Sequence, residues 1–373
     1  MAAKILEWMS SNKTIIKIGA NFGILYGLSV LPGTAGLMTY KQYYQLRMRD
    51  PTAETPVVCH PNDMLKGCIY EVKNDFRYWK TNQEDQAKDH LEFEESLNDK
   101  VKFMMVPSTN PGHKGSMMSK FGCIISIPQY FMVHVLDEIP AVNSLSKGRL
   151  LSVLTKGQVD RTPRVPVDNE SVDGIALRHS LLLTREEKKF VMMRELISCR
   201  SNSDYVIGVL RCVTAGTCVG LMYYVREFMM NNVGNFFSML AKTDLQPIST
   251  LFARGSLYML ILGTSLVTYY SLLFMYKSHR EKQTDWAVAA ISQDYAKAGK
   301  GYYNRILSRN LSCRNILGPQ DGPYLYTAKG DLKSWFFAQE TPITERLAIM
   351  ESYLSEYNQK ENISNVNEEQ TGL

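Results

Sequence analysis

The sequence lacks the residue patterns that most metal, nucleotide and nucleophile enzymes require. It has no CxxC or CxxxC pair, no HxxxH or HxH pair, no P-loop, no GxGxxG and no GxSxG elbow. Its seven cysteines are scattered, which argues against a disulfide framework and suits a reducing compartment. The net charge of +5 is spread along the chain, without the basic block that binds nucleic acid. We therefore expect no cofactor, no metal ion and no nucleic-acid partner.

Two long apolar runs are the strongest signal that is present. They cover residues 205–225 and 255–276, and each has about 20 residues, the length at which a helix crosses the hydrocarbon core of a bilayer. Charged residues follow each run, and the loop at 226–254 between them is short and nearly uncharged. Only helices and closed barrels satisfy their backbone hydrogen bonds in lipid, so we expect a two-helix membrane hairpin. The chain is thus predicted to be an integral membrane protein.

A third apolar run, residues 18–38, follows a basic N-terminal segment at 1–17 and is predicted to be a further transmembrane span. Gly19, Gly23 and Gly27 recur there at every fourth residue, a pattern that lets another helix approach closely in lipid. The alternative is a glycine-rich segment with no defined packing partner. No small-residue cleavage site follows the basic segment, so we interpret it as an uncleaved anchor of the kind that mitochondrial import reads.

Most of the remaining chain is polar and is predicted to form a soluble α-rich (α+β) domain from both sides of the hairpin. Its two parts are residues 41–204 and residues 277–350. Residues 360–373 are expected to be a disordered tail, because their composition is polar. Basic residues flank the outer ends of the hairpin, so the positive-inside rule places both parts on the same side of the membrane. The predicted fold class is mainly α.

Three segments of the soluble parts have informative patterns. Residues 121–135 are apolar but too short to span and are broken by a proline, so we expect a buried strand or core segment. Residues 183–199 are predicted to be a helix in which Thr184 and Glu187 form a capping box. Residues 279–318 are predicted to be helical up to a Gly-Pro pair.

The order of these segments resembles the transmembrane protein 177 family. The motifs that carry the resemblance are IISIP at 124–128, LTREEKKFVMMREL at 183–196 and a C-terminal block at 303–330, and the resemblance covers roughly residues 120–340. It implies a multi-pass protein of the mitochondrial inner membrane. In such a protein the side that the positive-inside rule favours, and with it the C-terminal region, is the matrix. It further implies a non-enzymatic role in the biogenesis of cytochrome c oxidase subunit 2. The implied partners are the membrane chaperone of that subunit and the copper metallochaperones that deliver its copper.

The C-terminal block also supplies residues that we expect to dock a partner. They are Asn310, Arg314, Gly318, Tyr326, Thr327 and Trp335. Aromatic side chains in this region are of the kind that anchor protein interfaces, but they fit the core of the domain equally well.

The first hairpin run contains two features that permit more than one interpretation. Arg211 lies near its start, where an intramembrane charge is often functional, although a long side chain there can also extend to the interface. Gly216 and Gly220 form a GxxxG pattern, which packs against either the other hairpin helix or a foreign subunit.

A second, weaker resemblance is to membrane zinc peptidases of the HtpX and Oma type. In those enzymes an HExxH helix precedes a membrane hairpin and a later helix supplies the third zinc ligand. Arg194 and Ser198 of RELIS stand at the two histidine positions, and Glu195 stands at the general base. Gln283 of REKQTD stands at the carboxylate ligand. A guanidinium does not deprotonate to bind zinc, so we expect a degenerate peptidase plan and no enzyme activity. The alternatives are an active metallopeptidase-like protein and an ordinary amphipathic helix beside a hairpin.

Overall fold

A computed structural model describes most of the chain from residue 61 onward. The described residues are 61–83, 100–106, 110–117, 122–139, 144–146, 164–201, 203–228, 246–333 and 341–371. The helices are α4 (Asp63–Gln83), α7 (Val172–Leu181), α8 (Arg185–Arg200), α9 (Ser203–Phe228), α11 (Gln246–Ala289), α12 (Gln293–Ile316), α13 (Gly318–Leu325) and α14 (Ile343–Thr371), with short 3-10 turns at Gln129–Met132 and Leu136–Glu138. The strands are β1 (Val101–Val106), β2 (Gly112–Gly115), β3 (Cys123–Pro128), β4 (Ser144–Ser146) and β5 (Arg164–Pro166). The predicted span at 18–38 lies outside the described residues.

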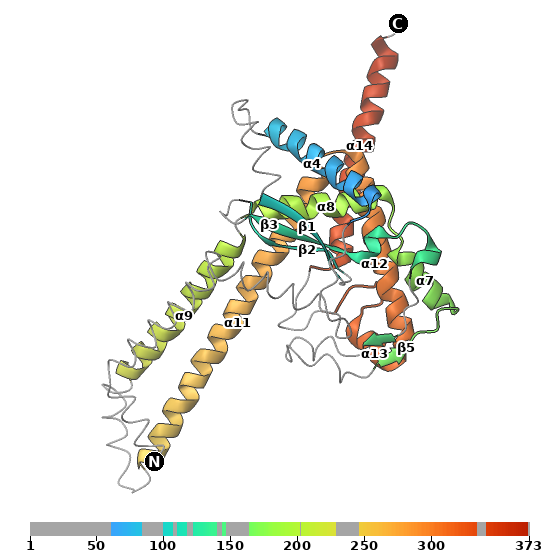
Figure 1. The fold of residues 1–373 in the computed structure, drawn as a ribbon. Helices are drawn as coiled ribbons and strands as arrows, with labels where there is room; N and C mark the ends of the chain where they lie inside the picture. The colour runs from blue at the N-terminus through green and yellow to red at the C-terminus, as the bar shows by residue number, and fades with distance from the viewer. Residues whose placement is uncertain are drawn as a thin grey trace. The chain divides into compact units, whose positions relative to one another are not determined.

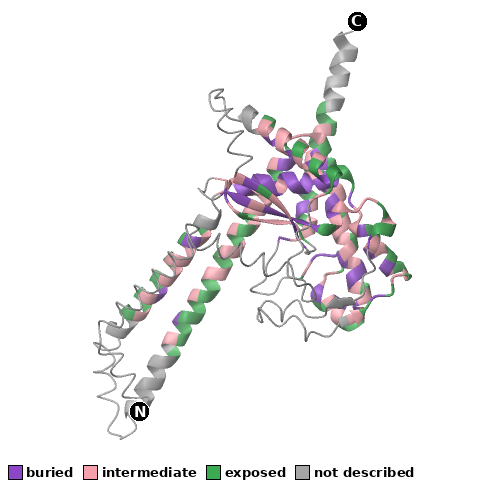
Figure 2. Ribbon diagram, in the orientation of Figure 1, coloured by how far each residue is buried: buried purple, intermediate pink, exposed green. Residues whose placement is uncertain are grey.

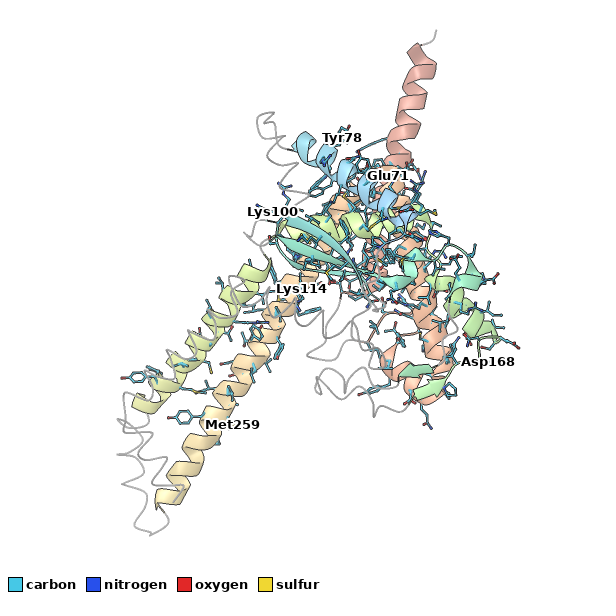
Figure 3. The ribbon with its side chains drawn as sticks, viewed as in Figure 1. Glu71, Tyr78, Lys100, Lys114, Asp168 and Met259 are labelled. Carbon is cyan, nitrogen blue, oxygen red and sulfur yellow. The ribbon has the colours of Figure 1, made fainter. Side chains whose placement is uncertain are left out.

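The chain divides into two compact units, and the first contains α9 and α11 as far as Met275. We call it the hairpin unit. These two helices lie side by side (Figure 1) and carry stretches long and apolar enough to cross a membrane, Val206–Tyr224 and Tyr258–Ala289. In the most apolar 18 residues of each stretch only 6% are buried, and Figure 2 shows these parts of α9 and α11 mostly in the colours of intermediate and exposed residues. Met259, labelled in Figure 3, is 69% exposed. Apolar side chains that point outward suit lipid, so the predicted pair of apolar hairpin helices is confirmed.

The second unit, which we call the core unit, is assembled from segments before and after the hairpin. Its central helix α12 packs against α7, α8, α13 and α14, while α8 also packs against α4 and two strands. The largest buried side chains, among them Phe190, Tyr303 and Met350, belong to one continuous core. The predicted mainly α fold with a smaller β component is confirmed.

A small sheet lies in the core unit in the order β1-β3-β2. β3 is parallel to β1, with Val101 opposite Cys123, and antiparallel to β2, with His113 opposite Ile125. Because β3 is the central strand, its side chains are largely buried on both faces. The apolar segment predicted to be a buried strand therefore does form one, and its partner β2 places His113 beside the helices.

The capping box predicted for α8 is confirmed. The Thr184 hydroxyl accepts a hydrogen bond from the backbone N–H of Glu187, and the Glu187 carboxylate accepts one from the backbone N–H of Thr184 at 2.7 Å. These two bonds satisfy orphan donors at the start of the helix and fix where α8 begins. The register of α8, and hence the direction of each of its side chains, follows from that start.

Two predicted segment boundaries differ from the structure. Residues 279–318 are not one helix, because α11 ends at Ala289 and Ser292 caps a new helix by accepting a hydrogen bond from Tyr295 N–H. The interruption allows α12 to run in a new direction and pack against α8. α14 continues to Thr371 through residues predicted to be a disordered tail at 360–373. Its first half packs on α12, and each further helical residue then adds a hydrogen bond without a new nucleation cost.

Gly299 tests how tightly α12 is packed. A Cβ atom at this position would lie 2.6 Å from Cε2 of Phe190 and 2.7 Å from Sδ of Met350, and both side chains are buried. We therefore expect Gly299→Ala to lower the free energy of unfolding by about 1–3 kcal/mol, even though alanine favours helix. Gly67, the fifth residue of α4, is the matched control, since nothing lies within 4 Å of its Cβ position.

Gly67→Ala is expected to raise stability by roughly 0.5–1 kcal/mol through helix propensity alone. Denaturant unfolding of the two purified full-length variants in detergent measures both changes. If both substitutions stabilise the protein, the contact of α12 with α8 and α14 is looser than described.

Candidate functional site

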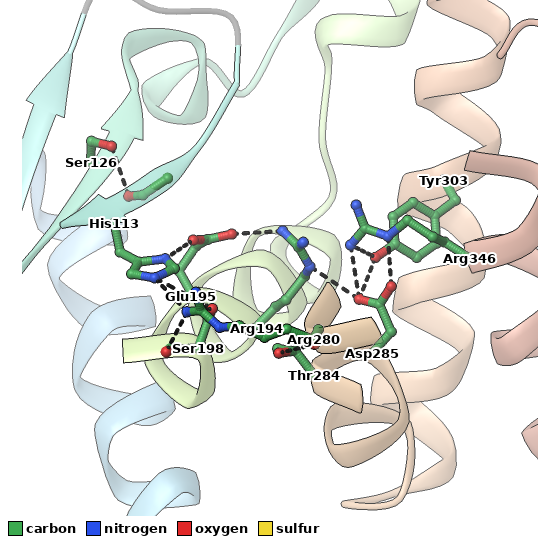
Figure 4. Close-up of polar contacts among 11 residues, drawn as sticks. His113, Ser126, Arg194, Glu195, Ser198, Arg280, Thr284, Asp285, Tyr303 and Arg346 are labelled. Carbon is green, nitrogen blue, oxygen red and sulfur yellow. Dashed lines mark hydrogen bonds and ion pairs between the residues drawn. The ribbon is translucent and has the colours of Figure 1, made fainter. Parts of the chain in front are cut away.

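Three of the four positions that resemble a peptidase site line a cleft of about 440 Å³ in the core unit. α8 contributes Arg194, Glu195 and Ser198. Ser198 comes four residues after Arg194 and three after Glu195, so each of these two shares a helix face with it. β2 contributes His113, and the part of α11 after the hairpin contributes Arg280. Figure 4 shows these side chains pointing toward one another. The tertiary structure therefore brings together three of the four predicted positions and adds two residues that were not predicted.

His113 lies between an anion and a cation in this cleft. One guanidinium nitrogen of Arg280 lies 2.6 Å from the hydroxyl oxygen of Ser198, 2.8 Å from its carbonyl oxygen and 2.9 Å from Nε2 of His113. Nδ1 of His113 lies 2.7 Å from a carboxylate oxygen of Glu195 and donates to it, because an ionised carboxylate only accepts. The imidazole is therefore held between a carboxylate and a guanidinium.

Beside the cleft, Asp285 is fully buried and accepts hydrogen bonds from three side chains. Arg194 donates to it at 3.0 Å, Arg346 donates at 2.6 and 2.9 Å, and the hydroxyl of Tyr303 donates at 2.7 Å. The guanidinium of Arg346 also lies 4.7 Å from the ring centre of Tyr303, close enough for a cation–π contact. Arg194 continues the network by donating to Glu195 at 2.7 Å. One network thus connects α8, α11, α12 and α14 (Figure 4).

The network keeps its carboxylates ionised despite burial. Burial alone would raise the pKa of Glu195, but the charge of Arg194 and the hydrogen bond from His113 outweigh it and lower the pKa from 4.5 to about 2. Burial likewise opposes ionisation of Asp285, and the charges of Arg346 and Arg194 lower its pKa below the ordinary 3.8. Both groups are therefore anions at neutral pH, and both are already paired.

These residues do not fit a zinc ion. Arg280 places a permanent positive charge against Ser198 and His113, where a metalloprotease holds its cation, and Arg194 occupies the position of the first histidine ligand. Within the described part of the chain, no three His, Cys, Asp or Glu side chains are grouped so as to hold a metal ion. The arrangement suits recognition of a negatively charged group better than polarisation of a carbonyl by a metal.

One predicted site position lies away from the cleft. Gln283 is exposed and does not line the cleft, whereas Arg280, three residues earlier on the same helix, does. Three residues are almost one helical turn, but they change the face enough to exchange a surface position for an inward one. His113 was missed because it lies 82 residues from Glu195 in the sequence. For Asp285 the sequence did contain a usable signal. The residue lies one helical turn before the apolar Val288 and Ala289, which places it on the buried face of the helix.

Most residues expected to dock a partner have structural roles in the core unit. Asn310 is buried and donates to the carbonyl oxygen of Gly330 at 2.7 Å. Gly318 has φ of +81°, which glycine adopts without strain, and it separates α12 from α13. The Thr327 hydroxyl accepts two backbone N–H groups of the turn that brings Tyr326 opposite Leu332.

The other docking residues differ in position. Arg314 is half-buried and Trp335 lies outside the described residues. The exposed aromatic side chain of this block is Tyr324, at 57%. For Asn310, Gly318 and Thr327 the contacts thus favour a role in the fold of the block.

In the hairpin unit, Arg211 is bonded to the opposite helix. Its Nε donates to the hydroxyl of Tyr269 at 2.9 Å, so the charge has a polar partner on α11. Gly216 and Gly220 behave differently, because no described atom lies within 4 Å of a Cβ placed at either position. The glycine face of α9 is therefore not covered by α11. Gly19, Gly23 and Gly27 lie outside the described residues.

Comparison with known proteins identifies a family. The family described as Transmembrane protein 177 matches residues 63–368. A curated relative named Transmembrane protein 177 from Danio rerio is 30% identical over 164 residues, which cover 44% of this chain and 47% of the relative. The Homo sapiens protein of that name is 31% identical, covering 48% of this chain and 53% of the relative, and the Mus musculus protein is 25% identical, covering 73% and 80%.

The zebrafish and human alignments span only about half the length of those relatives. No solved structure matches the chain.

Removal of the Asp285 charge tests the network. Asp285→Asn leaves Arg194 and Arg346 buried without their shared anion, so we expect the free energy of unfolding to fall by about 3–5 kcal/mol. Asp63→Asn is the control, because Asp63 pairs with Lys66 on the surface and its loss is expected to change nothing measurable. Denaturant titration of full-length protein measures both. Equal, small effects would show that the buried network is not a main source of stability.

The lowered pKa of Glu195 predicts how stability depends on pH. Its folded pKa of about 2 lies below its ordinary 4.5, so its contribution, at most about 3 kcal/mol, is present above pH 4.5 and is lost as the pH falls toward 2. Glu195→Gln should be less stable than the parent at pH 7 and should lose less stability between pH 4.5 and 2. Unfolding midpoints across this window measure the difference, with the exposed Glu356→Gln as control. Parallel curves for all three proteins would contradict the prediction.

Proposed function

The chain belongs to the transmembrane protein 177 family, and we propose that it is a non-enzymatic assembly and stabilisation factor of the mitochondrial inner membrane. In this proposal it supports biogenesis of cytochrome c oxidase subunit 2. It does so by binding the membrane chaperone of that subunit and the copper metallochaperones that act with it. The core unit would lie in the matrix, on the side that the basic residues around the hairpin favour.

The observation that carries the proposal is the open glycine face of α9. Without a hydrophobic driving force between helices in lipid, transmembrane helices associate where small residues allow their backbones to approach. Gly216 and Gly220 lie one turn apart on α9, and no described side chain of the hairpin covers them. A transmembrane helix of a partner protein can pack there. The face therefore supports a role that depends on binding another membrane protein.

The chemistry of the cleft supports a non-enzymatic role. A zinc peptidase needs neutral imidazoles and a carboxylate aimed at one cation. Here Arg194 and Arg280 bring permanent positive charge to those places, and Glu195 accepts hydrogen bonds from Arg194 and His113. A carboxylate with a pKa near 2 is also a poor general base at neutral pH. A fold with this plan can bind a polypeptide without cutting it.

Leucine at the two glycines tests the proposal. We expect Gly216→Leu/Gly220→Leu to reduce recovery of the subunit 2 chaperone at least about tenfold when the tagged full-length protein is purified from mitochondria in mild detergent, because leucine side chains hold the partner helix away. Gly263→Leu is the matched control, since it also adds leucine at an uncovered glycine of the hairpin but on α11. Quantitative mass spectrometry of the companions is the readout.

Three outcomes distinguish the proposal from its rivals. Loss of the subunit 2 chaperone from the double-variant preparation, with its retention in the Gly263→Leu preparation, supports packing of the partner on the α9 face. Recovery that is unchanged in both variants contradicts that face as the binding surface. Absence of the chaperone and the metallochaperones from the parent preparation would overturn the proposed function itself.

A further inference from the structure

The cleft carries more positive than negative charge. Of the described side chains that line it, the cations are Arg194, Lys277, Arg280, Arg309 and Arg346, and the carboxylates are Glu195 and Glu281. Asp285, which both Arg194 and Arg346 contact, brings the carboxylates to three, so the cations exceed them by two. Like charges gathered in a partly enclosed space repel one another, and an anion placed among them relieves that repulsion.

The cations of the cleft other than Arg194 and Arg346 come from two helices. Lys277 and Arg280 lie on α11, Arg309 lies on α12 and donates to Asn110 at 3.2 Å, and Asn110 comes just before β2. Donors that approach from several directions suit a group with several acceptor oxygens around a tetrahedral centre. Arginine forks in particular match the geometry of phosphate oxygens. The volume of about 440 Å³ is in the range of small-ligand sites and exceeds what one anionic group fills.

Lys277 and Arg280 follow closely after the second predicted span in the sequence. The predicted span at 255–276 ends one residue before Lys277 and four residues before Arg280, and α11 continues through both without a break. At a rise of about 1.5 Å per residue, four residues advance the helix by about 6 Å, which is within the headgroup region. Basic residues that close to the end of a span are in reach of lipid phosphates.

We propose that this cleft is a phosphate-binding site, occupied by the phosphate of an anionic lipid headgroup or by a free phosphate group. The site is independent of the proposed assembly function, which depends on the glycine face of α9. Lys277, Arg280 and Arg309 would contact the phosphate, while Arg194 and Arg346 are engaged by Asp285 and supply the surrounding positive charge.

Two arms of one experiment distinguish the sources of the phosphate. In the first, full-length protein in detergent is titrated with inorganic phosphate against chloride at constant ionic strength, and the thermal unfolding midpoint is followed. In the second, the protein is reconstituted in nanodiscs of phosphatidylcholine with or without phosphatidylglycerol, and the anionic lipid retained per protein is measured by native mass spectrometry. We expect a rise of the midpoint in the first arm, or retained phosphatidylglycerol in the second, or both.

Matched charge variants assign the effect to the cleft. Lys277→Gln/Arg309→Gln is expected to weaken the apparent affinity about tenfold or more, because it removes two charge-assisted contacts. Lys297→Gln/Lys300→Gln on α12 removes the same charge outside the cleft and should leave the affinity unchanged. Lys277→Gln alone, at an exposed position, serves as the variant that preserves folding, and it should weaken binding by a smaller factor.

The proposal is overturned by any of three results. One is that neither inorganic phosphate nor phosphatidylglycerol binds the parent protein. Another is that the cleft variants and the control variants weaken binding equally, which would indicate nonspecific attraction to net charge. The last is stabilisation by a peptide that ends in a free carboxylate with no response to either phosphate source, which would make the cleft a peptide site.

Discussion

The core unit depends on one buried anion. The Asp285 carboxylate holds Arg194 of α8 and Arg346 of α14 and accepts the hydroxyl of Tyr303 from α12, so one residue of α11 connects four helices. A buried charge of this kind is tolerated only when its partners are correctly placed, because an unpaired ion in the interior is very costly. The requirement restricts how the helices can pack. It also explains how a domain made of two distant parts of the chain is joined through its centre.

The same network decides the chemistry available to the cleft. Arg194 is shared between Asp285 and Glu195, and Glu195 in turn orients His113 toward Arg280. Each polar group of the network is paired with a neighbour of opposite charge or complementary hydrogen-bonding character, so Glu195 is already engaged by Arg194 and His113. A peptidase-like order of elements is therefore compatible with the non-enzymatic role that we propose. Fold and function are separable in this way because function resides in a few side chains.

The hairpin unit and the core unit differ in the direction that their apolar side chains face. On α9 and α11 most apolar side chains face outward, and the polar contact between Arg211 and Tyr269 lies between the two helices. In the core unit the opposite holds, with Phe190 and Met350 inside. The glycines of α9 belong to the hairpin unit, where small residues allow another helix to approach the backbone closely. We thus propose two separate binding surfaces, the glycine face of α9 for a transmembrane helix and the cleft of the core unit for an anion.

The sequence alone determined the local features: the two apolar runs of α9 and α11, the Thr184 cap and the buried strand β3. Each is set by residues close together in the chain, through the length of an apolar run, a three-residue cap or a short apolar stretch. Tertiary structure alone decided the cleft. His113 meets Glu195 across more than 80 residues, and Arg280, not Gln283, turns inward because the packing of α11 sets its face. Such pairings depend on long-range packing, which no local pattern encodes.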